Sequence, residues 1–311
     1  MSEIRLRIMT PQDRSEVAEL IYASLNHWYQ THGRPAIFSG GPQVTEVFYD
    51  VYSVLEPGCA VVAENPRTGR LMGSCFYHPR PHHVSLGIMN VHPNYFGTGV
   101  GRALLQHIID FTDQAGYKSL RLTQSAFNLD SFSLYNRAGF VPRGAYQDMF
   151  VPVPAGGLQA AAPPGAGQVR AAGPDDVAGM AALEMEVSGI TRETDCRYAI
   201  ENRLGFWRVS VYENLRGQID GWIISCGHPA FNMLGPCVTR SDQEAAALVY
   251  VELNHHRERS PVFLVPVERG RLVRQMYDWG ARNCELHLYQ VRGQFRPFQG
   301  ISMPTFLPET A

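Results

Sequence analysis

Hydrophobic and polar positions in the first half of the chain switch between helical and strand-like spacing. Apolar residues at helical spacing predict helices over about 11–25, 44–55, 99–115 and 129–138. Apolar runs bounded by turn residues predict strands that start near Cys59, Arg70, His83 and Ser119, and a closing strand over 145–153. Antiparallel strands followed by alternating strands and helices indicate a mixed α/β sheet with helices on its faces.

The pattern repeats after the middle of the chain. "LRIMTPQDRSEVAELIYASL" from Leu6 is similar to "VRAAGPDDVAGMAALEMEVS" from Val169, and "LYNRAGF" from Leu134 is similar to "MYDWGAR" from Met276. A stretch rich in proline, glycine and alanine separates the copies, and this composition is typical of a linker. We therefore predict one domain over 1–152, a linker over 153–168 and a shorter second copy over 169–311.

Composition narrows the class of protein without naming a reaction. The 311 residues suffice for two domains, and the formal net charge of −2 argues against non-specific nucleic-acid binding. No apolar stretch approaches the roughly 18 residues of a membrane span, and the charged start lacks a signal core, so we expect no membrane partner and a cytoplasmic location. The six cysteines form no CxxC pair, and we expect no metal site.

The first segment that indicates a binding function is "VHPNYFGTGVGRALL", which runs from Val91 to Leu105. Three alternate glycines precede a predicted helix, and successive backbone N–H groups at a helix start form a site for an anion such as a phosphate. The Walker loop needs Gly-Lys-Ser/Thr, where this chain has Gly101-Arg102-Ala103. The dinucleotide fingerprint lacks its third glycine. An ATPase or a dehydrogenase is therefore disfavoured.

The same segment resembles the coenzyme A loop of the GNAT acetyltransferase superfamily, Q/R-x-x-G-x-G/A, with Phe96, Gly99 and Gly101 in register. Phe96 departs from the Gln or Arg of that pattern. "NLDSFSLYNRAGF", from Asn128 to Phe140, resembles the later family element N-x-x-A-x-x-L-Y-x-x-x-G-F. The resemblance implies an α/β fold of two tandem GNAT-like units, each a mostly antiparallel sheet flanked by helices, with acetyl-coenzyme A as cofactor and acyl transfer as reaction.

The resemblance also implies roles for particular residues. Tyr135 takes the position of the general acid that protonates the leaving thiolate. Main-chain groups around Asn90 and Val91 would face the acetyl group, and Asn128 and Ser131 would lie beside the coenzyme arm. The base for the amine is sought among residues that wall the acceptor side in similar enzymes, with Glu46 named first and Asp50, His78, His82 and His83 beside it. The phosphates would meet the loop residues Phe96, Gly97, Thr98, Gly99, Val100, Gly101 and Arg102.

The second copy shows no glycine loop. Its strand from Ala230 runs directly into "SDQEAAALVYVEL", with Ser241 as the expected helix cap, so we predict one coenzyme A per chain and a structural role for Tyr277. The expected partner is a small-molecule amine acceptor, and the chain would be a monomer with a pseudo-dimeric interior or a homodimer. Two alternatives stay open: a non-catalytic acyl-coenzyme A sensor, and transfer to the amine of a protein or peptide.

Overall fold

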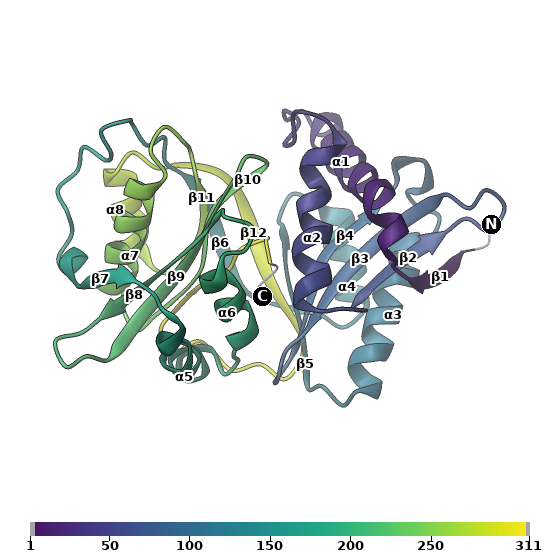
Figure 1. Cartoon of the computed structure of the whole chain (residues 1–311). Helices are drawn as coiled ribbons and strands as arrows, with labels where there is room; N and C mark the ends of the chain where they lie inside the picture. Colours follow the sequence, from purple (N-terminus) through teal and green to yellow (C-terminus); the bar gives the residue numbers. More distant parts are fainter. Residues whose placement is uncertain (1–3, 309–311) are drawn as a thin grey trace. The chain divides into compact units, whose positions relative to one another are not determined.

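A computed structural model describes residues 4–308, which fold into two units (Figure 1). The first unit comprises 4–79, 83–120 and 306–308, and the second comprises 80–82 and 121–305. Among these residues, no helix is both long and apolar enough to cross a bilayer. Short 3-10 helices precede several α-helices and strands, at Pro11–Asp13, Pro42–Thr45, Pro93–Tyr95, Ala166–Gln168 and Pro174–Asp176.

The sheet of the first unit is antiparallel, and its strands follow in chain order. It consists of β1 (Arg5–Ile8), β2 (Ala60–Glu64), β3 (Leu71–Pro79) and β4 (Val84–Val91). The register between β3 and β4 shifts between Cys75 and Tyr77. Such a bulge bends the strand and redirects the residues beyond it. In this chain, the glycine turn comes directly after β4.

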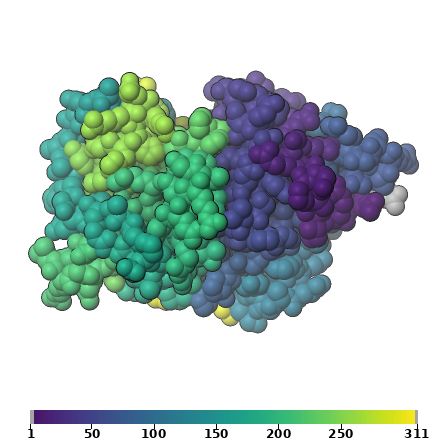
Figure 2. Space-filling model, viewed as in Figure 1, coloured from purple at the N-terminus to yellow at the C-terminus, as the bar shows by residue number. Residues whose placement is uncertain are grey.

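Helices cover both faces of this sheet. They are α1 (Arg14–Thr31), α2 (Glu46–Leu55) and α3 (Val100–Gln114). Ser74 and Asn90 form one register pair, and Asn90 bonds Ser24 of α1, whereas the neighbouring Gly73 lies against α3. Because adjacent strand residues point to opposite faces, α1 and α3 lie on opposite faces. In Figure 2 the purple and dark blue residues of α1 and α2 cover the visible face of this unit.

The helix boundaries agree with the sequence analysis except at α1, which extends to Thr31 rather than ending near Leu25. The additional turns are held by side chains that the apolar period does not reveal. The ring of His32 stacks on that of Trp28, with 4.3 Å between the ring centroids, and its Nδ1 lies 2.7 Å from the Trp28 carbonyl oxygen. Gly33, with φ of 72°, then allows the chain to leave the helix.

The sheet of the second unit has one strand from the first repeat inserted among strands of the second. The order runs β12 (Arg282–Gly293), β6 (Val141–Phe150), β11 (Val262–Pro266), β10 (Phe231–Thr239), β9 (Ile219–His228), β8 (Trp207–Glu213) and β7 (Val169–Ala171). β6 pairs antiparallel with both β11 and β12, whereas β10 and β11 are parallel. Short β13 (Ile301–Met303) pairs with β10. β5 (Ser119–Ser125) ends in this unit, where the Ala126 amide donates to the Leu286 carbonyl.

Two pairs of helices pack on the second sheet, and α4 (Leu129–Arg137) precedes β6. The pairs are α5 (Val177–Ser188) with α6 (Glu193–Glu201) and α7 (Asp242–His255) with α8 (Gly270–Asp278). Gly221 of β9 lies against Leu248 of α7, and the next residue, Trp222, donates its indole N–H to the Met180 carbonyl of α5. The two helices therefore lie on opposite faces, and the α7 side holds a large apolar core that includes Phe263.

The duplication is visible in a pair of matching ion networks. Arg7 binds both oxygens of Asp13 at 2.7 Å and donates to Glu64, and Arg170 binds both oxygens of Asp176 at 2.8 Å and donates to Glu213. In each case the aspartate also accepts from the backbone amide three residues before it. The same strand-to-helix junction is therefore built twice.

The start of the segment predicted as a linker packs against other residues of the second unit. Val151 and Val153 are buried in the core of the second unit, and the amide of Val153 donates to the Arg259 carbonyl. Further along, the Leu158 amide donates to Asn254 Oδ1. Composition did not reveal this packing, because a few valines suffice to bury the chain when a neighbour supplies the partners for its backbone. The division into 1–152, 153–168 and 169–311 stays a prediction about the repeated units, and the boundaries of the two folded units differ from it because β6 pairs with β11 and β12.

Candidate active site

The glycine turn links β4 to α3 through two residues with left-handed backbone. The His92 ring accepts the Asn94 amide at 3.2 Å and starts the turn, and Pro93–Tyr95 forms a 3-10 helix. Gly97 and Gly99 then have φ values of 74° and 95°, which favour glycine over any residue with a side chain. An added Cβ at either glycine would meet no heavy atom within 4 Å. The loop thus needs glycine for its backbone and faces open space.

Five amides of this loop are free to bind an anion. The amides of Gly97, Gly99, Val100, Gly101 and Arg102 have no hydrogen-bond partner among residues 4–308. The amides of Phe96 and Thr98 donate to the carbonyls of Pro93 and Tyr95. These two amides are therefore not available to a phosphate, which differs from the prediction made from the sequence. The tight turn uses these two amides and leaves the other five without partners among residues 4–308.

The charge at this helix start also suits an anion. The first turn of α3 contains no acidic residue, and it carries the exposed Arg102. The helix dipole adds roughly half a positive charge at the same place. The first turn of α3 thus combines donors with positive potential.

Gly73 of β3 holds α3 close to the sheet. A Cβ on Gly73 would lie 2.8 Å from the Asn90 carbonyl oxygen and 2.8 Å from Val100 Cγ1. Both distances are shorter than real Cβ contacts, so only glycine permits this approach. The first turn of α3 is therefore positioned by a glycine on a separate, earlier strand, which the sequence analysis did not single out.

Asn90 and Val91 lie at the end of β4, as the sequence analysis placed them. The Asn90 side chain is buried, and its Oδ1 accepts from Ser24 at 2.9 Å. Its Nδ2 has no partner among the described residues. A buried amide N–H without a partner is costly, and a bound acceptor would satisfy it. Val91 pairs with Gly73, and the next amide, that of His92, donates to the Met72 carbonyl.

Phe96 stands where the family pattern has Gln or Arg. Its ring is 46% exposed and lies 6.1 Å from the His27 ring of α1. It offers no side-chain donor, and its amide is used in the turn. Phe96 therefore contributes an apolar surface beside the loop rather than a contact to an anion.

The later motif forms a capped helix in the second unit. Asn128 Oδ1 accepts the Ser131 amide at 3.0 Å, so both residues form the N-cap of α4. Tyr135 is buried at 6% exposure, with its ring 5.7 Å from that of Phe140. Gly139, with φ of 88°, ends the helix. The motif spacing is thus explained locally by a cap, a buried ring and a helix stop.

The candidate bases are engaged in other contacts. Glu46 and Asp50 on α2 form ion pairs with Arg14 at 2.6 and 2.7 Å. His78 is buried with its Nδ1 2.8 Å from Glu56, and the buried His83 lies 3.2 Å from Ser85. His82 is exposed. Arg14 thus holds the Glu46 carboxylate between α1 and α2.

The corresponding helix start in the second unit is closed to anions. Ser241 caps α7 by accepting the Gln243 amide at 3.3 Å, and its hydroxyl bonds Glu244. Asp242 and Glu244 make the first turn acidic. These charges repel a phosphate where α3 would attract one.

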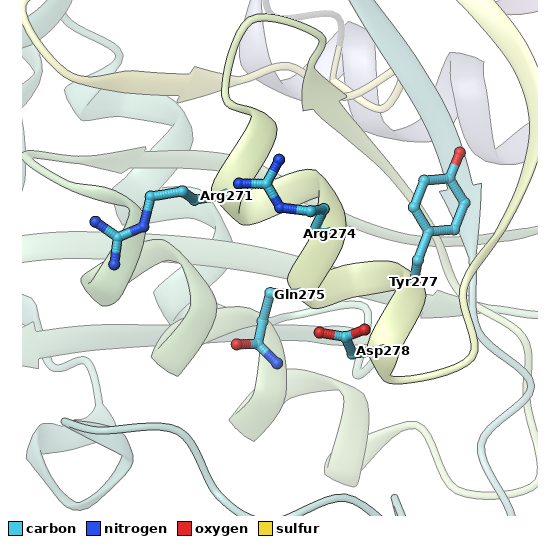
Figure 3. Close-up of a pocket in the computed structure, with 5 residues that line it drawn as sticks. All are labelled: Arg271, Arg274, Gln275, Tyr277 and Asp278. Carbon is cyan, nitrogen blue, oxygen red and sulfur yellow. The ribbon is translucent and has the colours of Figure 1, made fainter.

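Tyr277 differs from Tyr135 in its surroundings. Figure 3 shows it among side chains of the single helix α8 that line a shallow hollow of about 310 Å³. It is 46% exposed and its hydroxyl donates to Gln147 at 2.8 Å. Nothing in this hollow comes from a second element, so it offers no enclosed site around Tyr277.

Comparison with known protein families gives a match to part of the chain. The model of the acetyltransferase (GNAT) family matches residues 23–140, which include the whole glycine turn. The GNAT match covers α3 and α4 together, the two elements that carry the motifs found in the sequence.

Similar proteins extend the GNAT likeness to the whole fold. A putative acetyltransferase from Pyrococcus horikoshii is 13% identical with a TM-score of 0.75, covering 97% of this chain and 95% of that one. A GCN5-related N-acetyltransferase from Sphaerobacter thermophilus is 18% identical with a TM-score of 0.63, over 96% and 98%. A tandem GNAT protein from the clavulanic acid biosynthesis pathway is 15% identical with a TM-score of 0.60, over 94% and 98%. The predicted fold of two tandem GNAT-like units is confirmed.

One relative is similar in sequence to this chain over a shorter stretch. The UPF0157 protein YqkA of Bacillus subtilis is 32% identical over 103 residues, which are 33% of this chain. The match spans 28% of the length of that protein.

The second unit also contains a buried polar cluster that the sequence analysis missed. Asp148 of β6 faces Glu285 of β12, with His287 Nδ1 2.9 Å from Asp148 Oδ1. Their ligand atoms lie within 4.8 Å of one another, and Ser125 donates to Glu285. Burial raises the pKa of Asp148, and His287 opposes that rise. Asp148 and His287 are 139 positions apart in sequence, so no spacing pattern reveals the cluster.

Proposed function

We propose that this protein transfers an acetyl group from acetyl-coenzyme A to the primary amine of a small molecule. The observation that carries the proposal is the start of α3, where five amides without partners meet open space and positive potential. These amides suit a pyrophosphate, and the unpartnered Asn90 Nδ2 suits a carbonyl oxygen. The match of residues 23–140 to the acetyltransferase (GNAT) family supports the same reaction class.

Acetyl-coenzyme A supplies an activated thioester when bound. The new bond joins the amine nitrogen to the acetyl carbon, the carbon–sulfur bond breaks, the nitrogen releases one proton, and the thiolate takes up one proton. We propose Tyr135 as the donor of that proton, following its place in the family motif. Glu46 is held by Arg14, so we assign it to the junction of α1 and α2 rather than to the base.

One coenzyme binds per chain in this proposal. The capped, acidic start of α7 supports this number, because it lacks both the glycines and the charge of the α3 loop. The Bacillus relative is similar to part of the sequence, and the tandem GNAT protein is similar in fold. Neither similarity bears on the number of coenzymes bound. The acceptor class, a small-molecule amine, rests on analogy with other proteins of duplicated fold.

The test compares Gly99→Glu with Gly116→Glu by calorimetry of acetyl-coenzyme A binding to the full chain. Both glycines have positive φ and open space, and they lie at opposite ends of α3. The strain is therefore matched, whereas only Gly99→Glu places a negative charge at the free amides. We expect a stoichiometry of one for the parent and Gly116→Glu, and no binding for Gly99→Glu. Equal affinity of the two variants would remove the loop assignment.

A thiol-release assay with a panel of amines then separates an enzyme from a sensor. Turnover with small amines supports the proposal, and turnover restricted to peptides assigns a peptide acceptor. Acetyl-coenzyme A binding without turnover on any amine would favour a non-catalytic acyl-coenzyme A sensor.

A further inference from the structure

The second unit contains a cleft that the proposed reaction does not use. It has a volume of about 590 Å³, within the range of small-molecule sites. Its walls come from the start of β8, the end of β9 and the end of α7. The helix start equivalent to the coenzyme loop, at Ser241, lies at the other end of α7. The cleft is therefore not a remnant of a second coenzyme site.

Positive charge dominates the walls of this cleft. Arg208, Arg257 and Arg259 line it, and the one carboxylate among residues 4–308 that pairs with them, Glu252, is completely buried behind Arg208. That carboxylate is further bound by the hydroxyls of Ser210 and Ser225. The carboxyl end of α7 opposes an anion by roughly half a charge, which is small against three guanidinium groups.

The arginines keep donors free for a ligand. Arg257 Nε donates to the Asn254 carbonyl at 3.3 Å, and Arg259 Nη1 donates to the Gly227 carbonyl at 2.7 Å. Each guanidinium has five N–H groups, so most of them are left over. Gly227 is part of this arrangement, because a Cβ there would lie 2.6 Å from Arg259 Nη1.

The ring of His256 adds a neutral donor. Asn232 Nδ2 donates to the Cys226 carbonyl at 3.1 Å and lies 2.7 Å from His256 Nδ1, so Nδ1 is the acceptor. Burial, then the charges of Arg259, His255 and Arg208, lower the pKa of His256 to about 4. The ring is therefore neutral at pH 7, and Nε2 carries its proton. The cleft is rich in donors and offers few acceptors.

We propose that this cleft binds a small oxyanion, a phosphate or carboxylate group, held by Arg257 and Arg259. Phe206, which also lines the cleft, supplies an apolar wall for the body of such a ligand. The second unit would then be a ligand-binding domain in its own right, in addition to the coenzyme loop of the first.

The experiment titrates the full chain carrying Gly99→Glu, so that the coenzyme loop contributes nothing. Inorganic phosphate and benzoate are added at constant ionic strength, with chloride as the control anion, and binding is followed by calorimetry. Arg257→Gln and Arg259→Gln each remove one positive charge from the walls of the cleft. Arg216→Gln is the matched control, because this exposed arginine lies in the turn at the other end of the β8–β9 hairpin.

We expect saturable binding of phosphate or benzoate, weakened about tenfold by each arginine variant, with Arg216→Gln unchanged. Phosphate binding alone assigns a phosphate ligand, and benzoate binding alone assigns a carboxylate. The proposal is overturned if neither anion binds more tightly than chloride, or if Arg216→Gln weakens binding as much as Arg257→Gln. Thermal unfolding without anion checks that each variant is folded.

Discussion

The close approach of α3 to β3 makes Gly73→Ala a sensitive test of how the coenzyme loop is held. The added Cβ would lie 2.8 Å from the Asn90 carbonyl oxygen and from Val100 Cγ1, and 3.0 Å from Leu104 Cδ1. The first two distances are about 0.6 Å short of ordinary contact at 3.4 Å. The carbonyl belongs to a paired strand and cannot rotate away, so α3 must move outward.

The size of the effect depends on two opposing contributions. Overpacking of this kind costs roughly 1–3 kcal/mol, and the loss of glycine freedom in the unfolded chain returns about 0.4–1 kcal/mol. We expect Gly73→Ala to lower the free energy of unfolding by roughly 0.5–2.5 kcal/mol. Because Val100 lies in the first turn of α3, the same shift should also weaken acetyl-coenzyme A binding.

Gly144→Ala is the matched control. Gly144 is a strand glycine of β6 without positive φ, and a Cβ there would meet no heavy atom within 4 Å. Urea unfolding followed by circular dichroism should show this variant unchanged or slightly stabilised, with unchanged coenzyme affinity in calorimetry. If Gly73→Ala is as stable as Gly144→Ala and binds the coenzyme equally well, then the approach of α3 to β3 is not as close as these distances require.

Three further predictions concern single side chains. Tyr135→Phe should lower turnover while leaving acetyl-coenzyme A affinity nearly intact, and equal turnover in the thiol-release assay would reassign the acid. Arg192→Met should cost roughly 3–5 kcal/mol of unfolding free energy, because Glu184, whose oxygen lies 2.6 Å from Arg192 Nε, would be left buried and unpaired. Adding Glu184→Leu should restore more than half of that loss in urea unfolding, and no recovery would contradict the pairing. The pKa of His256 is lowered from 6.5 to about 4 in the folded chain. As pH falls, the unfolded chain therefore binds a proton at this residue at a higher pH than the folded chain does. The free energy of unfolding should drop by roughly 2–3 kcal/mol between pH 7 and 4.5 as a result. His256→Gln should show a smaller drop, and an identical drop would rule out this residue as the source.

Local features of the site were readable from sequence because they depend on a few neighbouring residues. Gly97 and Gly99 adopt positive φ because the turn between β4 and α3 requires it, and their spacing reports that backbone directly. The Asn128 cap and the Gly139 stop bound α4 in the same way. The family motif combines such local signals, so it indicated the fold and the coenzyme loop without any knowledge of packing.

Other predictions from the sequence were incomplete where long-range contacts decide the outcome. The amides of Phe96 and Thr98 were expected to face a phosphate, but a 3-10 turn uses them. The proline- and alanine-rich segment was predicted as a linker from its composition, and the structure adds that Val153 at its start is buried in the core of the second unit. In both cases a neighbouring carbonyl or apolar surface supplied a partner that composition alone could not show.

The sequence by itself determined the repeat, the order of helices and strands, and the glycine turn, because periodicity and turn chemistry act over a few residues. Only the tertiary structure decided that β6 pairs with β11 and β12, that Gly73 sets the position of α3, and that Arg208 lines a cleft with Arg257 and Arg259. These features join residues tens of positions apart. Their pairing depends on which surfaces pack against each other, and the pattern of residues along the sequence does not specify that packing.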